Sequence, residues 1–454
     1  MVRSSRVVLP GGVYPAAILV SGGRIARIGP RAAAFSAGRE IDAGDLVVMA
    51  GTVDSHVHVN EPGRAEWEGF ESAGMAAAAG GTTTIVDMPL NSLPVTTTIA
   101  ALEAKVAAAA GTCRVDFGLW GGIVPGNGNA LAALLEAGAL GLKAFLVPSG
   151  IDEFPAVDDE HLGAAMAVVA PTGAPVLVHA EDADEIARAD RRGLEERPGS
   201  CAAWLASRPA SAEARAVQRV AELCERTGAR AHVVHVAAEE AVDAVRGARS
   251  RGAPLTAETC PHYLAFACEE VAEGDTRFKC APPIREARHR DALWRGLRDG
   301  ALDLVASDHS PCPPELKPPG DFENAWGGIA GLELRLPATW TEARGRGVQL
   351  GSLARWLAEA PARLAGLSAR KGRIAAGCDA DLVLWDPDRE FVVQADALHH
   401  RHRATPWEGR TLRGVVEATI LRGHLIYEGG RFPGSPRGRW LSRTSPVAAA
   451  AAAR

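Results

Sequence analysis

Short apolar runs alternate with segments of helical periodicity through the middle of the chain. The runs occupy residues 53–59, 84–88, 115–120, 141–147, 175–179, 232–236, 254–259 and 302–307. Eight β–α units of this kind, spread over about 320 residues, predict a closed (β/α)8 TIM barrel with insertions. A doubly wound open sheet is the alternative. It would require a glycine-rich phosphate-binding turn after the first strand, and the sequence has none there.

The two ends of the chain show a different pattern, in which short strands are separated by glycine-rich turns. The strand-like runs are residues 6–9, 16–20, 24–28 and 45–48 near one end, and 374–385, 390–393 and 419–427 near the other. Neither block can bury a sheet face alone. We therefore expect an α/β fold in which a distorted barrel carries a small composite β-sandwich formed by both termini. The expected divisions are 1–50 and 371–435 for the β-sandwich, 51–370 for the barrel, and 436–454 for an alanine-rich tail without assigned function.

Composition narrows the class of protein. The chain has 454 residues, of which 47% are hydrophobic, so it can bury a large core and is not disordered. The net charge of −6 offers no basic excess for binding nucleic acid. The first apolar stretch is interrupted by Pro10, Gly11 and Pro15, which argues against a membrane span or a signal peptide. Eight cysteines without a Cys-x-x-Cys pair argue against a disulfide framework and predict a cytoplasmic protein.

The first candidate chemistry is a pair of histidines at the end of the first predicted barrel strand. His56 and His58 are two residues apart, so their side chains point to the same face of a strand. They can therefore converge on one metal ion. A His-x-His pair taken alone is equally compatible with solvated or hydrogen-bonded core histidines.

Four further residues occupy equivalent places along the chain. His179 and His235 close two other apolar runs, Lys143 lies in the fourth, and Asp308 follows the eighth. A strand-end histidine is often a core residue, and a lysine flanked by apolar residues is often a surface group. The carboxyl ends of barrel strands, however, all open onto one face, so these side chains are expected to meet over a single cavity.

The number and type of these groups indicate two metal ions. Four imidazoles and one carboxylate suit zinc or a similar divalent ion, and they are too many for one open catalytic site. Two ions need a bridge, which Lys143 would supply if its neutral amine adds carbon dioxide and becomes an anionic carbamate. The sequence thus predicts two divalent ions, zinc first, with cobalt, manganese or iron as alternatives. Such ions lower the pKa of bound water toward about 7.

Longer motifs surround these residues. They are GTVDSHVHVNEPGRAEWEGF, AAAAGGTTTIVDMPLNSLPVTT, GLKAFLVPSGIDEFP, VLVHAED, AETCPHYLAF, FKCAPPIRE, VASDHSPCPPELK and GCDADLVLWDP. Together they resemble the cyclic amidohydrolases, which include dihydroorotases, hydantoinases and allantoinases, and they are most similar to the allantoinase group. The resemblance covers nearly the whole chain and implies a distorted barrel, a β-sandwich built from both termini and a two-metal centre.

The resemblance also implies an activity and a role for each predicted ligand. The implied ligands are His56 and His58 on the first ion, His179 and His235 on the second, carboxylated Lys143 between them, and Asp308 on the first ion. Asp308 would also transfer protons. A hydroxide bridging the two ions would open the hydantoin ring of allantoin to give allantoate, a step of purine catabolism. Relatives are commonly homotetramers, which implies a homo-oligomer.

Three positions favour allantoin over other cyclic amides. Dihydroorotases of this group typically carry arginine two residues after the second histidine, and Asn60 cannot pair with a substrate carboxylate as a guanidinium does. Hydantoinases usually carry tyrosine five residues after the bridging lysine, where this chain has Pro148. Asn91 is placed to hydrogen-bond ureido or ring amides, although a turn before Pro94 would also explain it.

Two further residues are predicted to contact the substrate, and three other functions are alternatives to the opening of allantoin. Cys280 would offer a backbone group, and Gly327 would let the backbone approach the ligand closely. A hydantoinase or dihydropyrimidinase is the nearest alternative, and a dihydroorotase-like enzyme is less favoured. A non-catalytic scaffold of the same fold is disfavoured because all six metal positions are filled.

Overall fold

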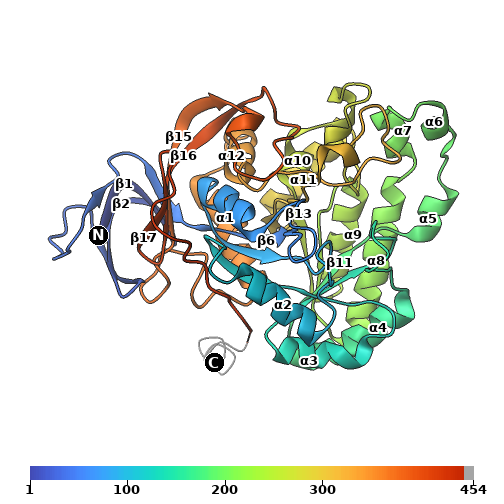
Figure 1. Cartoon of the computed structure of the whole chain (residues 1–454), viewed down its shortest axis with the longest axis horizontal. Coiled ribbons are helices and arrows are strands. Elements are labelled where there is room, and N and C mark those ends of the chain that lie inside the picture. The colour runs from blue at the N-terminus through green and yellow to red at the C-terminus, as the bar shows by residue number, and fades with distance from the viewer. Residues whose placement is uncertain (444–454) are drawn as a thin grey trace.

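The computed structural model describes residues 1–443 and shows a barrel of parallel strands, wrapped by helices, beside a second sheet (Figure 1). The barrel strands are β6 (Thr52–Val57), β7 (Thr82–Asp87), β8 (Asp116–Leu119), β9 (Gly121–Gly122), β10 (Leu142–Phe145), β11 (Val176–His179), β12 (Ala231–Val233), β13 (Leu255–Thr259) and β14 (Leu304–Val305). They form two parallel ladders, β6-β7-β8 and β9-β10-β11-β12-β13-β14. The ladders meet where Leu140 donates its backbone N–H to Leu119, and where Val57 pairs with His309 beyond β14. The predicted TIM barrel is therefore confirmed, and the doubly wound sheet is wrong.

Helices connect the barrel strands and cover the outside of the ring (Figure 1). They are α1 (Phe70–Ala79), α2 (Ile99–Ala109), α3 (Leu131–Glu136), α4 (Asp159–Val169), α5 (Ala183–Arg188), α6 (Arg192–Glu196), α7 (Cys201–Ala206), α8 (Ala210–Thr227), α9 (Glu239–Ser250), α10 (Pro261–Ala265), α11 (Ala287–Asp299), α12 (Arg335–Gly345), α13 (Leu350–Ala354) and α14 (Ala360–Leu364). The short helices α5, α6 and α7 fall between β11 and α8, so they form an insertion after that strand.

Helix α8 shows how the sequence sets the packing of these helices. Apolar side chains three or four residues apart form one buried face. They are Ala212, Ala216, Val217, Val220, Ala221, Leu223 and Cys224. The helix ends at Gly228, whose φ of 72° lets its N–H bond the carbonyl of Cys224. Glu213 is also buried on this helix, and a buried carboxylate needs partners of its own.

The second sheet is built from both ends of the chain, as predicted. Its strands are β1 (Val2–Leu9), β2 (Gly12–Ser21), β3 (Arg24–Pro30), β4 (Ile41–Asp42), β5 (Val47–Ala50), β15 (Leu382–Val392), β16 (Thr411–Leu421) and β17 (His424–Glu428). They follow the order β17-β16-β15-β5-β1-β2-β3, and β4 pairs with β1. Strand β5 joins the two ends because it pairs with β1 on one side and with β15 on the other.

A buried cluster of charges connects this sheet to the barrel. The Nζ of Lys371 lies 2.6 Å from Asp116 Oδ2 in β8, 2.5 Å from Asp381 Oδ2 and 3.0 Å from Asp379 Oδ2. Arg422 at the end of β16 pairs with Asp116 from the other direction. Arg370 pairs with Asp379 at 2.9 Å. Three carboxylates are thus balanced by three cations of the protein, so the cluster is an ionic contact between the sheet and the barrel.

Part of the predicted alanine-rich tail lies along the barrel. Trp440 forms a parallel bridge with Phe117 in β8, and the N–H of Leu441 donates to the Phe117 carbonyl at 2.7 Å. The remainder of the predicted tail, residues 444–454, lies outside the described residues.

Two of the composition-based expectations can be compared with the structure. All eight cysteines are buried free thiols, and the sulfurs of Cys201 and Cys268 lie 3.0 Å apart. Within residues 1–443, no helix combines the length and the apolar character that crossing a membrane requires.

Candidate metal centre

The six predicted ligands meet at the carboxyl-terminal mouth of the barrel. They are placed by five strands: His56 in β6, His58 after it, Lys143 in β10, His179 at the end of β11, His235 after β12 and Asp308 after β14. None exposes more than 7% of its surface. The four histidines and the aspartate line a cavity of about 410 Å³. The lysine is fully buried against Phe145, another residue of the cavity wall.

The two histidines of the first strand and the aspartate after the eighth form one compact group. His56 Nε2 lies 3.1 Å from Asp308 Oδ1, and His58 Nε2 lies 3.4 Å from the same oxygen. Nitrogen and oxygen atoms of these three side chains all lie within 4.8 Å of one another. This spacing fits donors that converge on a single cation.

His179 and His235 form the second group, on the neighbouring side of the cavity. Their ring centroids are 4.6 Å apart with the rings nearly perpendicular. The Phe145 ring stacks on His179 at 4.8 Å, and Lys143 Nζ lies 4.8 Å from the centroid of that phenyl ring. The His235 ring also lies 5.4 Å from that of His56, so the two groups adjoin each other.

Buried polar atoms without partners test whether these residues suit metal ions. His58 Nδ1, His235 Nδ1 and Lys143 Nζ are buried, and none has a hydrogen-bond partner among the described residues. Leaving such atoms unpaired costs about 1–3 kcal/mol each, so a protein rarely retains them without a ligand. Imidazole nitrogens beside a carboxylate are donors that divalent zinc prefers. The arrangement therefore fits two divalent ions.

The protonation states favour metal binding as well. Burial lowers the pKa of His58 to about 4 and holds the pKa of His235 well below its ordinary value, so both rings are neutral at pH 7. Burial also lowers the pKa of Lys143 to about 7, which leaves part of the amine neutral. At His56 burial is outweighed by the carboxylates of Asp308 and Glu258, and the pKa rises to about 9. A cation beside Asp308 would replace the proton that this cluster otherwise attracts.

Backbone strain is concentrated at the same cavity. Four non-glycine residues of the described chain have positive φ angles, and three of them line the cavity: Asn91 (74°), His235 (41°) and Asp308 (46°). Non-glycine residues adopt this region only when their surroundings hold them there. The structure therefore fixes the directions of these three side chains.

Of the three residues predicted to contact the substrate, two line the cavity and one does not. Asn91 and Gly327 line the cavity, and the Asn91 Oδ1 atom is buried without a partner in the described chain. Cys280 does not line it, because its carbonyl accepts the indole N–H of Trp204 at 3.1 Å and its neighbour Ala281 reaches the cavity instead. Of the two other positions used to choose a substrate, Pro148 lines the cavity and Asn60 does not.

Comparison with known families decides the type of protein. Residues 47–426 match the amidohydrolase family, which is more than four-fifths of the chain. The chain belongs to the amidohydrolase family. The match spans every barrel strand from β6 to β14 and both groups of candidate ligands.

Individual relatives of this amidohydrolase agree over nearly the full length. An allantoinase of Streptomyces avermitilis is 49% identical, over 98% of each chain. An allantoinase of Arabidopsis thaliana is 43% identical over 95% of this chain and 88% of the relative. Among solved structures, an L-hydantoinase (dihydropyrimidinase) from Arthrobacter aurescens superposes with a TM-score of 0.93 and 34% identity, covering 97% of this chain and 99% of that one.

Two buried glutamates that sequence reasoning missed hold the histidines of this amidohydrolase from behind. Glu258 accepts hydrogen bonds from His56 Nδ1 at 2.6 Å and from His232 Nε2 at 3.0 Å. Glu181 accepts one from His179 Nε2 at 2.7 Å. Carboxylates in this position fix which ring nitrogen faces the metal. Glu258 lies inside the predicted strand 254–259. A charged residue within an apolar run is unusual, and this signal could have identified Glu258 as a candidate site residue.

Other missed residues come from segments whose positions the sequence pattern does not determine. Trp204 in α7 and Arg208 after it line the cavity, as do Lys279 and Trp326. The ammonium of Lys279 lies 4.4 Å from the centre of the Trp204 ring and donates to the carbonyl of Glu323 at 2.9 Å. These contacts connect the insertion that contains α7 with the segments that carry Lys279 and Glu323, at the mouth of the barrel.

Proposed function

We propose that this amidohydrolase hydrolyses the hydantoin ring of allantoin to allantoate. The observation that carries the proposal is that four histidines and an aspartate from the ends of four strands line one cavity, with Lys143 of a fifth strand buried against its wall. The choice of ring is supported by relatives named allantoinase that are 49% and 43% identical over nearly the whole chain. A hydantoinase-type activity is the second candidate, because a solved L-hydantoinase has the same fold.

The six residues divide into two ion sites in this proposal. His56, His58 and Asp308 would hold one divalent ion, His179 and His235 would hold the other, and carboxylated Lys143 would supply an anion shared by both. When bound, two such ions supply hydroxide at neutral pH and polarise the carbonyl that is attacked. Zinc suits the imidazole-rich donor set, and cobalt, manganese or iron are alternatives.

Lys143 is prepared for carboxylation by its surroundings. Burial lowers its pKa to about 7, so a neutral amine is present at neutral pH. The amine nitrogen adds to the carbon of carbon dioxide and loses one proton, which gives an anionic carbamate. That anion removes the cost of an unpaired buried ammonium and supplies oxygen donors.

Asp308 is the residue that transfers a proton from the attacking water to the departing ring nitrogen. Its Oδ1 faces His56 and His58, and these and other histidines outweigh the effect of burial, so its pKa lies well below its ordinary value. The carboxylate is therefore ionised and can accept the proton of the attacking water. It then gives this proton to the departing ring nitrogen, since an amide anion is too basic to leave unprotonated.

Asn91, Pro148 and Gly327 lie on the wall where the rest of the ring and the ureido group would bind. The unpartnered Oδ1 of Asn91 is an acceptor for a ring or ureido N–H. Asn60 is buried and donates its amide to the Pro311 carbonyl at 3.4 Å, so it provides no cation for a substrate carboxylate. This favours a neutral ring such as allantoin over dihydroorotate.

Three further features remain proposals. The unit boundaries are taken as 1–50, 51–370 and 371–435. Eight unpaired buried cysteines support a place in the reducing cytoplasm. We also expect a homo-oligomer, with a tetramer as the first choice.

A substrate panel with metal quantification on the same sample tests the proposal. Allantoin, hydantoin, dihydrouracil and dihydroorotate are compared at equal concentration, and metal per chain is measured by mass spectrometry. We expect allantoin to be turned over fastest and two divalent ions per chain. Strong activity on another ring with negligible activity on allantoin would overturn the substrate. Absence of metal and of hydrolysis under every divalent supplement would favour a scaffold.

A further inference from the structure

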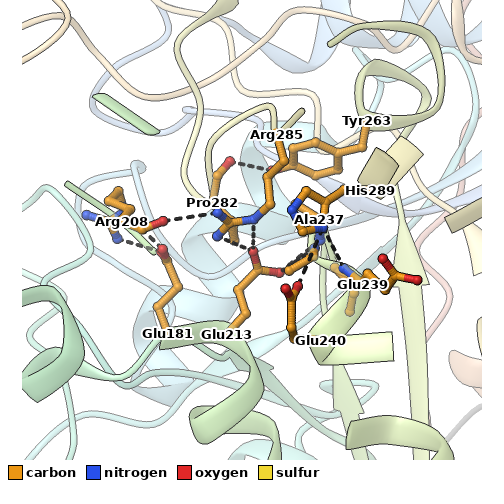
Figure 2. A network of polar contacts seen from close by, with 12 residues as sticks. Glu181, Arg208, Glu213, Ala237, Glu239, Glu240, Tyr263, Pro282, Arg285 and His289 are labelled. Atoms are coloured by element: carbon orange, nitrogen blue, oxygen red, sulfur yellow. Dashed lines mark hydrogen bonds and ion pairs between the residues drawn. The ribbon is translucent and has the colours of Figure 1, made fainter. Parts of the chain in front are cut away.

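Two ion pairs, drawn together in Figure 2, contact the segments that carry the second pair of histidines. They join Glu181 to Arg208 and Glu213 to Arg285. We infer that these four residues, here called the positioning frame, fix His179 and His235 in the geometry that holds the second ion. The inference rests on the proposed metal centre and adds residues that act through the two histidines; of the four, only Arg208 also reaches the cavity wall.

The first arm of the frame sets the orientation of His179. The ring donates from Nε2 to Glu181 Oε2 at 2.7 Å, so its Nδ1 is left with the free lone pair. Arg208 holds this carboxylate with two hydrogen bonds, from Nε to Oε1 at 2.9 Å and from Nη2 to Oε2 at 2.5 Å. A two-pronged guanidinium–carboxylate pair fixes the direction of the carboxylate as well as its charge. Glu181 is completely buried, so water cannot replace its partners.

The second arm holds the turn that carries His235. Glu213 Oε2 accepts the backbone N–H groups of Ala237 at 2.9 Å and Ala238 at 3.2 Å. His235 itself has a φ of 41°, a conformation that a histidine keeps only when its neighbours impose it. Two hydrogen bonds to one buried carboxylate, two and three residues further along, are such a constraint.

The two arms are connected to each other. Arg285 Nε donates to Glu213 Oε1 at 2.7 Å, and its Nη1 donates to the Arg208 carbonyl at 3.1 Å (Figure 2). The frame therefore runs without interruption from the side chain of His179 to the backbone after His235. Its two carboxylates and two guanidiniums balance in charge, which allows Glu181, Glu213 and Arg285 to be buried and Arg208 to lie half-buried at the cavity.

The contacts of the frame are confined to one ion site. Within residues 1–443, none of its hydrogen bonds or ion pairs reaches His56, His58 or Asp308. Weakening the frame should therefore loosen one of the two ions and leave the other in place. Residues that orient metal ligands typically change metal affinity by about 10–100-fold.

The test compares two isosteric variants with a matched control. Glu181→Gln and Glu213→Gln keep the side-chain volume and one acceptor but remove the charge. Asp379→Asn removes a carboxylate that is 3% exposed and paired with Lys371, in the contact between the terminal sheet and the barrel. The full-length enzymes are titrated with zinc from a metal buffer, and bound zinc per chain is measured. The absorption spectrum after cobalt substitution reports the geometry at each ion.

We expect Glu181→Gln and Glu213→Gln to bind one zinc ion as the unaltered enzyme does and the second about 10–100-fold more weakly. Excess zinc should then restore the second ion and much of the turnover. Asp379→Asn should lower thermal stability and still bind both ions normally. The inference is overturned if the two glutamate variants bind both ions with unchanged affinity, or if both ions weaken equally.

A further variant keeps the test decisive if a glutamate variant does not fold. Arg208→Lys retains the positive charge but cannot make both hydrogen bonds to Glu181. It should weaken the second ion in the same direction, and unchanged zinc binding would again overturn the inference. Failure of the proposed function would give a different result. The unaltered enzyme would bind two ions, the frame variants would bind the second ion more weakly, and yet the unaltered enzyme would not hydrolyse allantoin.

Discussion

His56 Nε2 and Asp308 Oδ1 lie 3.1 Å apart, although one residue belongs to the first strand of the barrel and the other follows the last. The ring of strands closes at this point. Val57 pairs with His309, and the N–H of His58 donates to the carbonyl of His309 at 2.8 Å. The contacts that close the barrel therefore also bring together His56, His58 and Asp308, the first group of candidate ligands.

Replacing Asp308 with asparagine should separate its two proposed roles. Asparagine keeps an oxygen donor toward His56 and His58 but cannot accept and return a proton. Loss of general acid–base catalysis typically lowers turnover by about 100–10,000-fold. We expect the turnover of allantoin to fall within this range while most of the bound metal remains. Equal losses of metal and turnover would reduce Asp308 to a ligand.

Replacing Lys143 with alanine should remove the proposed carbamate. The variant is expected to lose bound metal and most of its activity, because the two ion sites then lack their shared anion. Short carboxylic acids such as acetate or propionate should restore part of both by filling the space. Metal content and allantoin turnover, measured with and without the acid, check this. A variant that keeps two ions and its full rate would show that no carbamate is needed.

The Asn91 side chain can be tested without disturbing the backbone. Its φ of 74° suits glycine, so Asn91→Gly removes the amide without adding strain. Loss of one hydrogen bond of about 1 kcal/mol should lower kcat/KM for allantoin roughly fivefold, with little change in Tm. Asn91→Ala should show the same kinetic loss together with a lower Tm, because alanine is strained at this φ. An unchanged kcat/KM in the glycine variant would assign Asn91 to the turn alone.

The charged cluster between the sheet and the barrel should make stability depend on pH. Burial, which raises the pKa of Asp379, is outweighed by Lys371 and Arg370, so the folded-state pKa lies below the ordinary value of 3.8. The folded state then binds this proton more weakly than the unfolded state. The free energy of unfolding that Asp379 contributes is present above pH 3.8 and is lost as the pH falls below it.

Denaturation of the unaltered chain and of Asp379→Asn at several pH values measures this contribution. The variant should be less stable by about 1–3 kcal/mol above pH 4, since it loses hydrogen bonds to charged partners. The difference should shrink as the pH is lowered toward 3. A difference that stays constant with pH would mean that the carboxylate charge does not contribute.

Most of the candidate metal ligands could be predicted from the sequence, because they follow a local pattern. His56, His58, His179 and His235 each stand at a strand end, and the carboxyl ends of barrel strands open onto one face. Periodicity therefore placed them near one another before any contact was known. Glu258 and Glu181 were missed, since a lone glutamate near a strand end gives no sign of the histidine it will meet.

The sequence by itself thus determined the barrel, the sheet built from both termini and the six candidate ligands, because alternation of side chains along a strand is a local property. Only the tertiary structure decided that Arg208 and Arg285 would hold Glu181 and Glu213 behind the histidines, and that Trp204 and Lys279 would close over the cavity. These contacts join an insertion after one strand to loops after others. Their geometry depends on how the whole ring packs, which no short stretch of sequence encodes.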